Sequence, residues 1–195
     1  WQNGQYVKTR ELDQVKPAFE DLLARLQTDH VDLGMIHFVD DPEEFTRVTA
    51  GEYMEYVRQL KSEGKIRHIG ISSHNPEVAK MAALQGEIEM ILFSINPAFD
   101  MMPAVRDIDQ YFAETYDEEL GGIAPIREEL YRICERQNVG ITVMKGYAGG
   151  RLFNAQTSPV GVALTPVQCL HYALTRPAVA SGRAGRQAGG RTQPP

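Results

Sequence analysis

His37 is the side chain best suited to acid–base chemistry in this sequence. It lies near the C-terminal end of the apolar run 31–39, which is typical of a strand covered on both faces. Barrel active sites form at that end of the strands, and a neutral imidazole can donate a hydrogen bond to a substrate carbonyl. We therefore interpret His37 as a candidate catalytic residue. The alternative is a hydrogen-bonded histidine of the core.

Polar residues also follow the later apolar runs. Ser72 and Ser73 follow the next run and are suited to holding an amide or a phosphate, or to forming a loop and helix cap. Asn96 precedes a proline, so a turn is the alternative to a ligand contact. Lys145 and Gly146 form a candidate phosphate contact, with a solvated lysine as the alternative.

Apolar periodicity predicts helices that alternate with short strands. Helices are expected at 11–27, 52–63, 75–86, 125–138 and 165–176, and strands at 31–39, 66–71, 88–95 and 141–144, with the start of another at 178–181. This alternation predicts right-handed βαβ units and a parallel sheet. It fits a closed barrel or an open doubly wound sheet, although the GxGxxG turn typical of the open type is absent from the sequence.

Two segments interrupt this rhythm. Residues 97–124 form a long connection, interpreted either as a functional lid or as a short surface helix. Residues 182–195 are rich in glycine and arginine and contain no apolar side chain larger than alanine, which predicts a disordered tail.

Composition narrows the class of protein. The 195 residues include 20 basic and 26 acidic side chains, and the net charge of -6 argues against a nucleic-acid partner. Membrane-length apolar runs and a signal peptide are absent from the sequence, so no membrane association is expected. Cys134 and Cys169 do not suggest a disulfide framework, so a cytoplasmic location is expected. His30, His68 and His171 lack metal-site spacing, and no metal site is predicted.

Two segments resemble signatures of the aldo/keto reductase family. Residues 22–37, LLARLQTDHVDLGMIH, resemble the signature SLxRLxxDxxDLxxxH, and residues 64–72, GKIRHIGIS, resemble GKIRxIGVSN. Residues 166–181 resemble the end of the barrel in bacterial members, which often carry an iron–sulfur extension. The resemblance covers roughly residues 5–181.

The resemblance implies a fold, a reaction and a cofactor. The fold is a partial (β/α)8 TIM barrel over residues 1–181, truncated at both ends so that the first strands and the last are missing. The reaction is hydride transfer from NADP(H) or NAD(H) to a small-molecule carbonyl substrate, an aldehyde or ketone. His37 matches the histidine that orients the carbonyl.

The resemblance also assigns cofactor contacts. Ser72 and Ser73 fall where the family's Ser-Asn pair holds the nicotinamide carboxamide, with serine replacing the asparagine. Asn96 is a candidate substitute for the family's strand glutamine, and Lys145 and Gly146 lie where the phosphates or nicotinamide face would pass.

Several family features have no match in the sequence. The catalytic aspartate, tyrosine and lysine cannot be placed in the chain, and the CxxCxxC cysteines of the iron–sulfur extension are absent, so no cluster is expected. We therefore expect an oxidoreductase by family that is inactive as this fragment. The alternatives are a non-catalytic, barrel-derived binding or interaction module, and another barrel enzyme, such as an isomerase, that uses His37 as acid or base.

Overall fold

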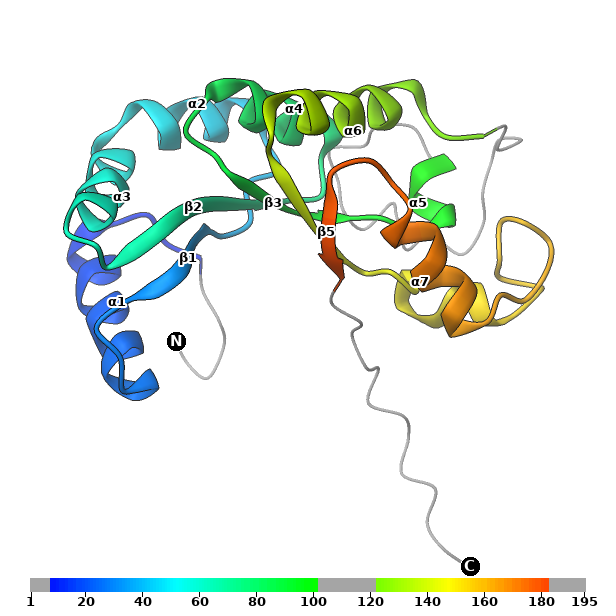
Figure 1. Cartoon of the computed structure of the whole chain (residues 1–195), viewed down its shortest axis with the longest axis horizontal. Helices are drawn as coiled ribbons and strands as arrows, with labels where there is room; N and C mark the ends of the chain where they lie inside the picture. The colour runs from blue at the N-terminus through cyan, green and yellow to red at the C-terminus, as the bar shows by residue number, and fades with distance from the viewer. Residues whose placement is uncertain (1–7, 102–121, 183–195) are drawn as a thin grey trace, which may run out of the picture.

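Parallel strands form a single sheet in the computed structural model, which describes residues 8–101 and 122–182 (Figure 1). The five strands of these residues lie side by side in chain order: β1 (Val31–Ile36), β2 (Ile66–Ser73), β3 (Met90–Ser94), β4 (Gly140–Met144) and β5 (Val179–Gly182). Every neighbouring pair is parallel, which confirms the prediction. Their carboxyl ends therefore lie at one edge of the sheet.

Helices precede the first strand and occupy the connections between the strands. They are α1 (Leu12–Leu26), α2 (Pro42–Ala50), α3 (Glu52–Ser62), α4 (Pro76–Gln85), α5 (Pro97–Met101), α6 (Pro125–Gln137), the 3-10 helix η2 (Ala148–Phe153) and α7 (Pro166–Leu174). Figure 1 shows α2, α3, α4 and α6 as an arc along one side of the curved sheet. In the described residues no helix has both the length and the apolar character needed to cross a membrane.

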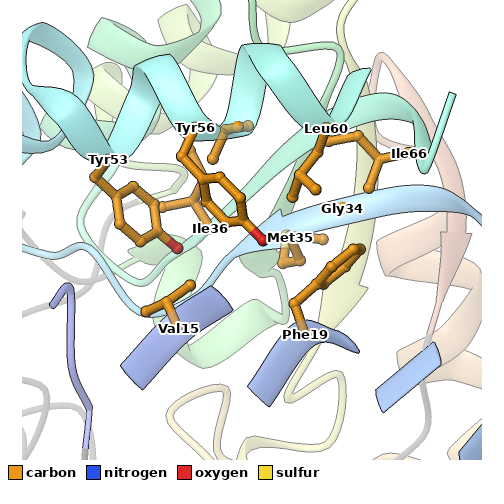
Figure 2. Close-up of a pocket in the computed structure, with 10 residues that line it drawn as sticks. Val15, Phe19, Gly34, Met35, Ile36, Tyr53, Tyr56, Leu60 and Ile66 are labelled. Atoms are coloured by element: carbon orange, nitrogen blue, oxygen red, sulfur yellow. The ribbon is translucent and has the colours of Figure 1, made fainter. Parts of the chain in front are cut away.

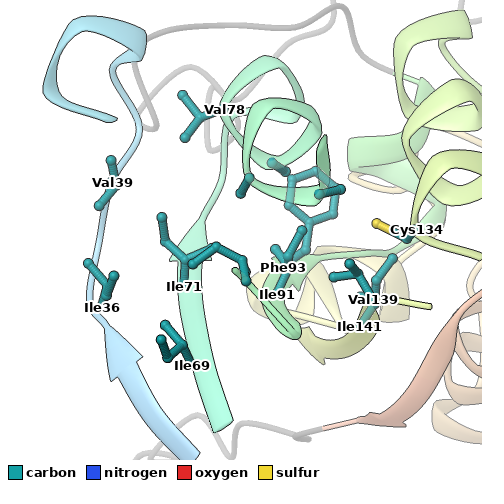
Figure 3. Close-up of a cluster of buried hydrophobic side chains, with 14 of the residues drawn as sticks. Ile36, Val39, Ile69, Ile71, Val78, Ile91, Phe93, Cys134, Val139 and Ile141 are labelled. Atoms are coloured by element: carbon teal, nitrogen blue, oxygen red, sulfur yellow. The ribbon is translucent and has the colours of Figure 1, made fainter. Parts of the chain in front are cut away.

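The core begins with one row of isoleucines across the sheet. Ile36, Ile71, Ile91 and Ile141 are successive partners on β1 to β4, and each is at most 1% exposed. Residues in register point to the same face of a sheet. Figure 3 shows this row among the other buried apolar side chains. The row fixes the register of the strands, and hence the positions of the polar residues that follow them.

Helix α4 illustrates how local signals and packing agree. Asn75 caps the helix by accepting a hydrogen bond from the backbone N–H of Glu77, Pro76 occupies the first turn, and Gly86 ends the helix with φ +88. Its buried face is built mainly from small residues, and it packs against β2, β3 and α6.

Some details differ from the sequence prediction. Helix α2 was not predicted, although the Asp41 side chain caps it and Pro42 follows in its first turn. The long connection starts with the short helix α5, and residues 102–121 lie outside the described residues. Gly182, assigned to the tail by the sequence analysis, is the last residue of β5 because it pairs with Val143. Residues 183–195 of the predicted tail are also outside the described residues.

Glu89 organises the amino-terminal edge of the sheet, opposite the candidate site. Its carboxylate accepts hydrogen bonds from Lys61 Nζ (2.5 Å), His68 Nδ1 (2.9 Å) and the Ile69 backbone N–H (3.1 Å). Partial burial alone would raise the pKa of Glu89, but these donors lower it from 4.5 to about 2. Because barrel active sites lie at the opposite, carboxyl edge of the strands, we expect these contacts to serve stability.

We expect Glu89→Gln to reduce the acid sensitivity of the fold. Because the folded-state pKa lies below the unfolded value, the carboxylate contributes its full stability above about pH 4.5 and loses it as the pH falls toward 2. Urea unfolding across this range should show the difference between wild type and variant shrinking as the pH falls. Glu129→Gln is the control, since the described contacts of that carboxylate are with Lys80 alone. A difference that is constant with pH would contradict the prediction.

Candidate active site

The ends of β1 and β2 bring His37 and Ser72 together. Ile36 pairs with Ile71 in the sheet, so the next residue of each strand is also adjacent. Ser72 Oγ lies 3.2 Å from His37 Nδ1 and accepts a hydrogen bond from the Phe38 backbone N–H at 2.7 Å. Ser72 is buried, whereas His37 is exposed and is not enclosed by core side chains.

The backbone after His37 is held by two cations from the segment before α1. Arg10 Nη2 donates to the His37 carbonyl at 2.6 Å, and Lys8 Nζ donates to the Phe38 carbonyl at 3.1 Å. Glu44 pairs with both cations, at 2.8 Å for Lys8 and 3.4 Å for Arg10. Phe38 has φ +55, so these contacts hold a left-handed turn directly after the histidine. Neither cation was predicted from the sequence, because both contact carbonyl oxygens, which have no sequence signature.

The electrostatic surroundings favour a neutral His37. Partial burial is the main cause of its lowered pKa, and electrostatic interactions with Arg10, then His74 and Lys8, lower it further. Asp40 opposes this shift. A group whose pKa falls below 6.5 is largely uncharged at neutral pH. The imidazole is therefore available as a hydrogen-bond donor rather than as a cation.

Asp40 anchors the loop after β1 to the end of β2. Its carboxylate accepts hydrogen bonds from Ser73 Oγ (3.0 Å), the His74 backbone N–H (2.6 Å) and His74 Nδ1 (2.9 Å). Asn75 Nδ2 donates to the Asp40 carbonyl at 2.9 Å. Burial would raise the pKa of Asp40, but the bonds from His74 and Ser73 lower it overall. The Ser73 hydroxyl thus donates to Asp40, and its predicted cofactor contact stays a prediction.

Asn96 joins the ends of β3 and β4. Its Nδ2 donates to the Lys145 carbonyl at 2.9 Å, and its Oδ1 accepts from the Phe99 backbone N–H at 2.9 Å. The residue is 0% exposed. These bonds serve the turn that the sequence offered as the alternative, and a cofactor contact by Asn96 stays a prediction.

Lys145 and Gly146 form the exit of β4. Lys145 has φ +55 and is half-buried, and burial lowers the pKa of its ammonium while Asp40 opposes the change. Gly146 is buried, but a Cβ added to it would meet no atom within 4 Å, so space is open on that side of its backbone. Gly149 and Gly150 follow with φ +67 and +93 in η2. A cation beside open backbone suits a phosphate or another anion.

His37 lines a cleft with a volume of about 620 Å³ between β1, α1 and the segment before it. Lys8, Arg10, Met35 and Tyr53 also line the cleft. This volume lies in the usual range for small-molecule sites, which is roughly 300–1,000 Å³. The arrangement can present an imidazole donor to a small polar ligand.

A smaller apolar pocket of about 70 Å³ lies beside this cleft, between β1, α1 and α3 (Figure 2). Val15, Phe19, Met35 and Tyr53 line both hollows. None of the predicted site residues lines the smaller pocket, which we interpret as part of the packing between α1 and the sheet. In the described residues, no group of three or more His, Cys, Asp or Glu side chains is placed to hold a metal ion.

Residues 3–180 match the profile of the Aldo/keto reductase family, and the chain belongs to that family. Oxidoreductase YdhF of Escherichia coli K12 is 28% identical over 173 residues, which cover 80% of this chain and 55% of the relative. Aldo-keto reductase YhdN of Bacillus subtilis is 34% identical over 77 residues, covering 40% and 22%. The chain therefore spans about half the length of YdhF and less of YhdN.

Solved structures confirm the fold. Aldo-keto reductase AKR11C1 from Bacillus halodurans, in its holo form, superposes with a TM-score of 0.62 at 24% identity, covering 94% of this chain and 59% of that chain. An aldo/keto reductase from Klebsiella pneumoniae in complex with NADP and acetate has a TM-score of 0.55 at 20% identity, covering 88% and 58%. The described sheet and its helices thus correspond to part of a (β/α)8 barrel, as the family resemblance implied.

Proposed function

We propose that the chain carries the histidine and part of the cofactor site for NAD(P)H-dependent reduction of an aldehyde or ketone. The observation that carries this proposal is an exposed His37 that follows β1 at the carboxyl edge of a reductase-type sheet and lines a cleft between β1 and α1. A neutral imidazole donates a hydrogen bond to the substrate carbonyl and orients it. The cofactor, when bound, supplies the hydride.

The residues after β4 fit a phosphate-bearing cofactor. Lys145 provides positive charge, and Gly146 leaves room for a close approach to the backbone. The NADP complex of the Klebsiella pneumoniae neighbour supports NADP(H) as the cofactor class. Ser72, Ser73 and Asn96 remain candidate contacts to the carboxamide, each with its protein hydrogen bonds already in place.

The names of relatives suggest the substrate class. Methylglyoxal reductase DkgB of Escherichia coli O157:H7 is 33% identical over 82 residues, covering 42% of this chain and 30% of the relative. We therefore propose small carbonyl compounds as substrates. We also propose a cytoplasmic location, supported by the buried free thiols of Cys134 and Cys169.

Titration of the chain with NADPH, followed by cofactor fluorescence, tests the proposal. We expect saturable binding, weakened about tenfold by Lys145→Ala, because a charge-assisted contact to phosphate is lost. Lys80→Ala is the matched control, since that lysine pairs with Glu129 on the outer helices. Equal affinity of the Lys145→Ala and Lys80→Ala variants would contradict the assignment of Lys145. No saturable binding at all would favour the alternative, a barrel-derived interaction module.

A further inference from the structure

Ser72 lies between two nitrogen atoms that make different demands on its hydroxyl. The Phe38 backbone nitrogen is 2.7 Å from Ser72 Oγ, and His37 Nδ1 is 3.2 Å from the same oxygen. We infer that Ser72 is a positioning residue that fixes His37 as the neutral tautomer with its proton on Nε2. The tautomer follows from the geometry at Ser72, and only its role toward a substrate carbonyl rests on the proposed function.

The proton count at Ser72 determines the direction of each bond. A backbone N–H can only donate, so Phe38 occupies one lone pair of Ser72 Oγ. The hydroxyl has one proton left to donate, and within the described residues His37 Nδ1 is the acceptor in reach. Ser72 is 2% exposed, so a hydroxyl proton pointing elsewhere would be buried without a partner. Nδ1 must therefore accept, and the proton of a neutral imidazole lies on Nε2.

The main chain keeps the serine and the histidine in this relation. The Val39 backbone N–H donates to the Ser72 carbonyl at 2.9 Å, while Arg10 Nη2 donates to the His37 carbonyl at 2.6 Å. Together with the Phe38 N–H bond, these contacts fix both sides of the left-handed turn at Phe38. The imidazole consequently approaches Ser72 Oγ from a constrained backbone rather than from a free loop.

The charged groups around His37 are compatible with the neutral form. Lys8 and Arg10 approach from the segment before α1, His74 follows β2, and Asp40 lies on the loop after β1. Burial and the three basic groups lower the pKa of His37, and Asp40 alone among the named groups raises it. An imidazolium would donate from both nitrogens and would displace the Ser72 proton from its acceptor.

The tautomer determines which hydrogen bonds His37 can make to the substrate carbonyl and Ser72 to the cofactor carboxamide. With Nδ1 accepting from Ser72, His37 offers Nε2–H as the donor to a substrate carbonyl. The Ser72 proton is already used, so this serine can only accept a further hydrogen bond, through its remaining lone pair. It can thus receive the N–H of a carboxamide but cannot donate to the carboxamide oxygen.

Long-range proton–nitrogen NMR spectra of the nitrogen-15-labelled chain, without cofactor, test the inference. The His37 signals are identified by their loss in His37→Gln. Above the pKa of His37, we expect Nδ1 to show the shift of an unprotonated nitrogen and Nε2 that of a protonated one. A wild-type spectrum with the proton on Nδ1, or an even mixture of tautomers, would overturn the inference without any change at Ser72.

Three serine variants separate positioning from packing. Ser72→Ala should lower the preference for the Nε2–H tautomer about fivefold, as expected from the loss of one hydrogen bond, and Ser72→Thr should restore it. Ser94→Ala, which removes a buried hydroxyl that has no partner in the described residues, should leave the ratio unchanged. An unaltered ratio in Ser72→Ala would overturn the inference. The tautomer ratio is measured without NADPH. A failure of the chain to bind NADPH would therefore contradict the proposed function and leave this measurement unaffected.

Discussion

Replacing Asp100 with alanine is expected to lower the free energy of unfolding by about 3–5 kcal/mol, the range for breaking a buried ion pair. Asp100 and Arg127 are both 0% exposed, and Arg127 Nη1 donates to Asp100 Oδ1 at 3.1 Å. The carboxylate also accepts from Tyr131 Oη at 2.6 Å and Tyr172 Oη at 2.9 Å. Alanine would remove this acceptor from the buried guanidinium, the buried Tyr131 phenol and the part-buried Tyr172 phenol.

The effect should be large because one carboxylate connects three helices. Asp100 belongs to α5, Arg127 and Tyr131 to α6, and Tyr172 to α7. The guanidinium also lies over the Phe93 ring, 4.8 Å from its centroid, and donates to the Ser94 carbonyl at 3.0 Å. The network thus attaches these helices to the end of β3, close to the candidate site.

Urea unfolding followed by circular dichroism measures the change. Asp100→Asn should be less damaging, because an amide oxygen still accepts hydrogen bonds. Arg132→Ala is the control on the same helix: its pair with Glu128 is exposed, and its loss should matter by less than about 0.5 kcal/mol. A loss below about 1 kcal/mol for Asp100→Ala would show that the surrounding groups find other partners.

The alternation of strands and helices was predictable because its signals are local. Each strand is a short apolar run, and Asn75, Thr165 and Gly86 mark helix ends by residue type alone. The parallel register then follows from burying Ile36, Ile71 and the later isoleucines in one row. The positions of His37 and Ser72 at the same edge of the sheet were therefore predictable from the sequence.

The long-range contacts around His37 could not be predicted from local sequence patterns. Arg10 acts on a carbonyl 27 residues away, and Asp40 acts on groups 33 and 34 residues away. Carbonyl oxygens and loop carboxylates have no periodic pattern, so only the folded chain shows which cation meets which oxygen. The position of Asn96 at a strand end suggested either a ligand contact or a turn. The orientation of its side chain depends on the Lys145 carbonyl at the end of the neighbouring strand, to which Asn96 Nδ2 donates.

The 195-residue chain is expected to reduce aldehydes with NADPH at no more than the background rate. Hydride delivery to a carbonyl carbon leaves an alkoxide that needs a proton, and the resemblance assigns the family's tyrosine donor to no residue of this sequence. Loss of a general acid lowers the rate roughly 10²–10⁴-fold for that step. Neutral His37 can donate a hydrogen bond to the carbonyl, but giving up its last ring proton would leave an imidazolate, so it is a poor substitute.

Absorbance of NADPH in the presence of methylglyoxal measures this turnover, with His37→Ala as the reference. Equal, background-level rates for both proteins are expected, whereas turnover that disappears in His37→Ala would contradict the prediction. Cofactor binding and turnover are independent results here. NADPH binding that is weakened by Lys145→Ala, together with absent turnover, would show that the β4 exit contacts the cofactor while the proton donor is missing. Binding depends on charge and space at Lys145 and Gly146, whereas the proton transfer does not.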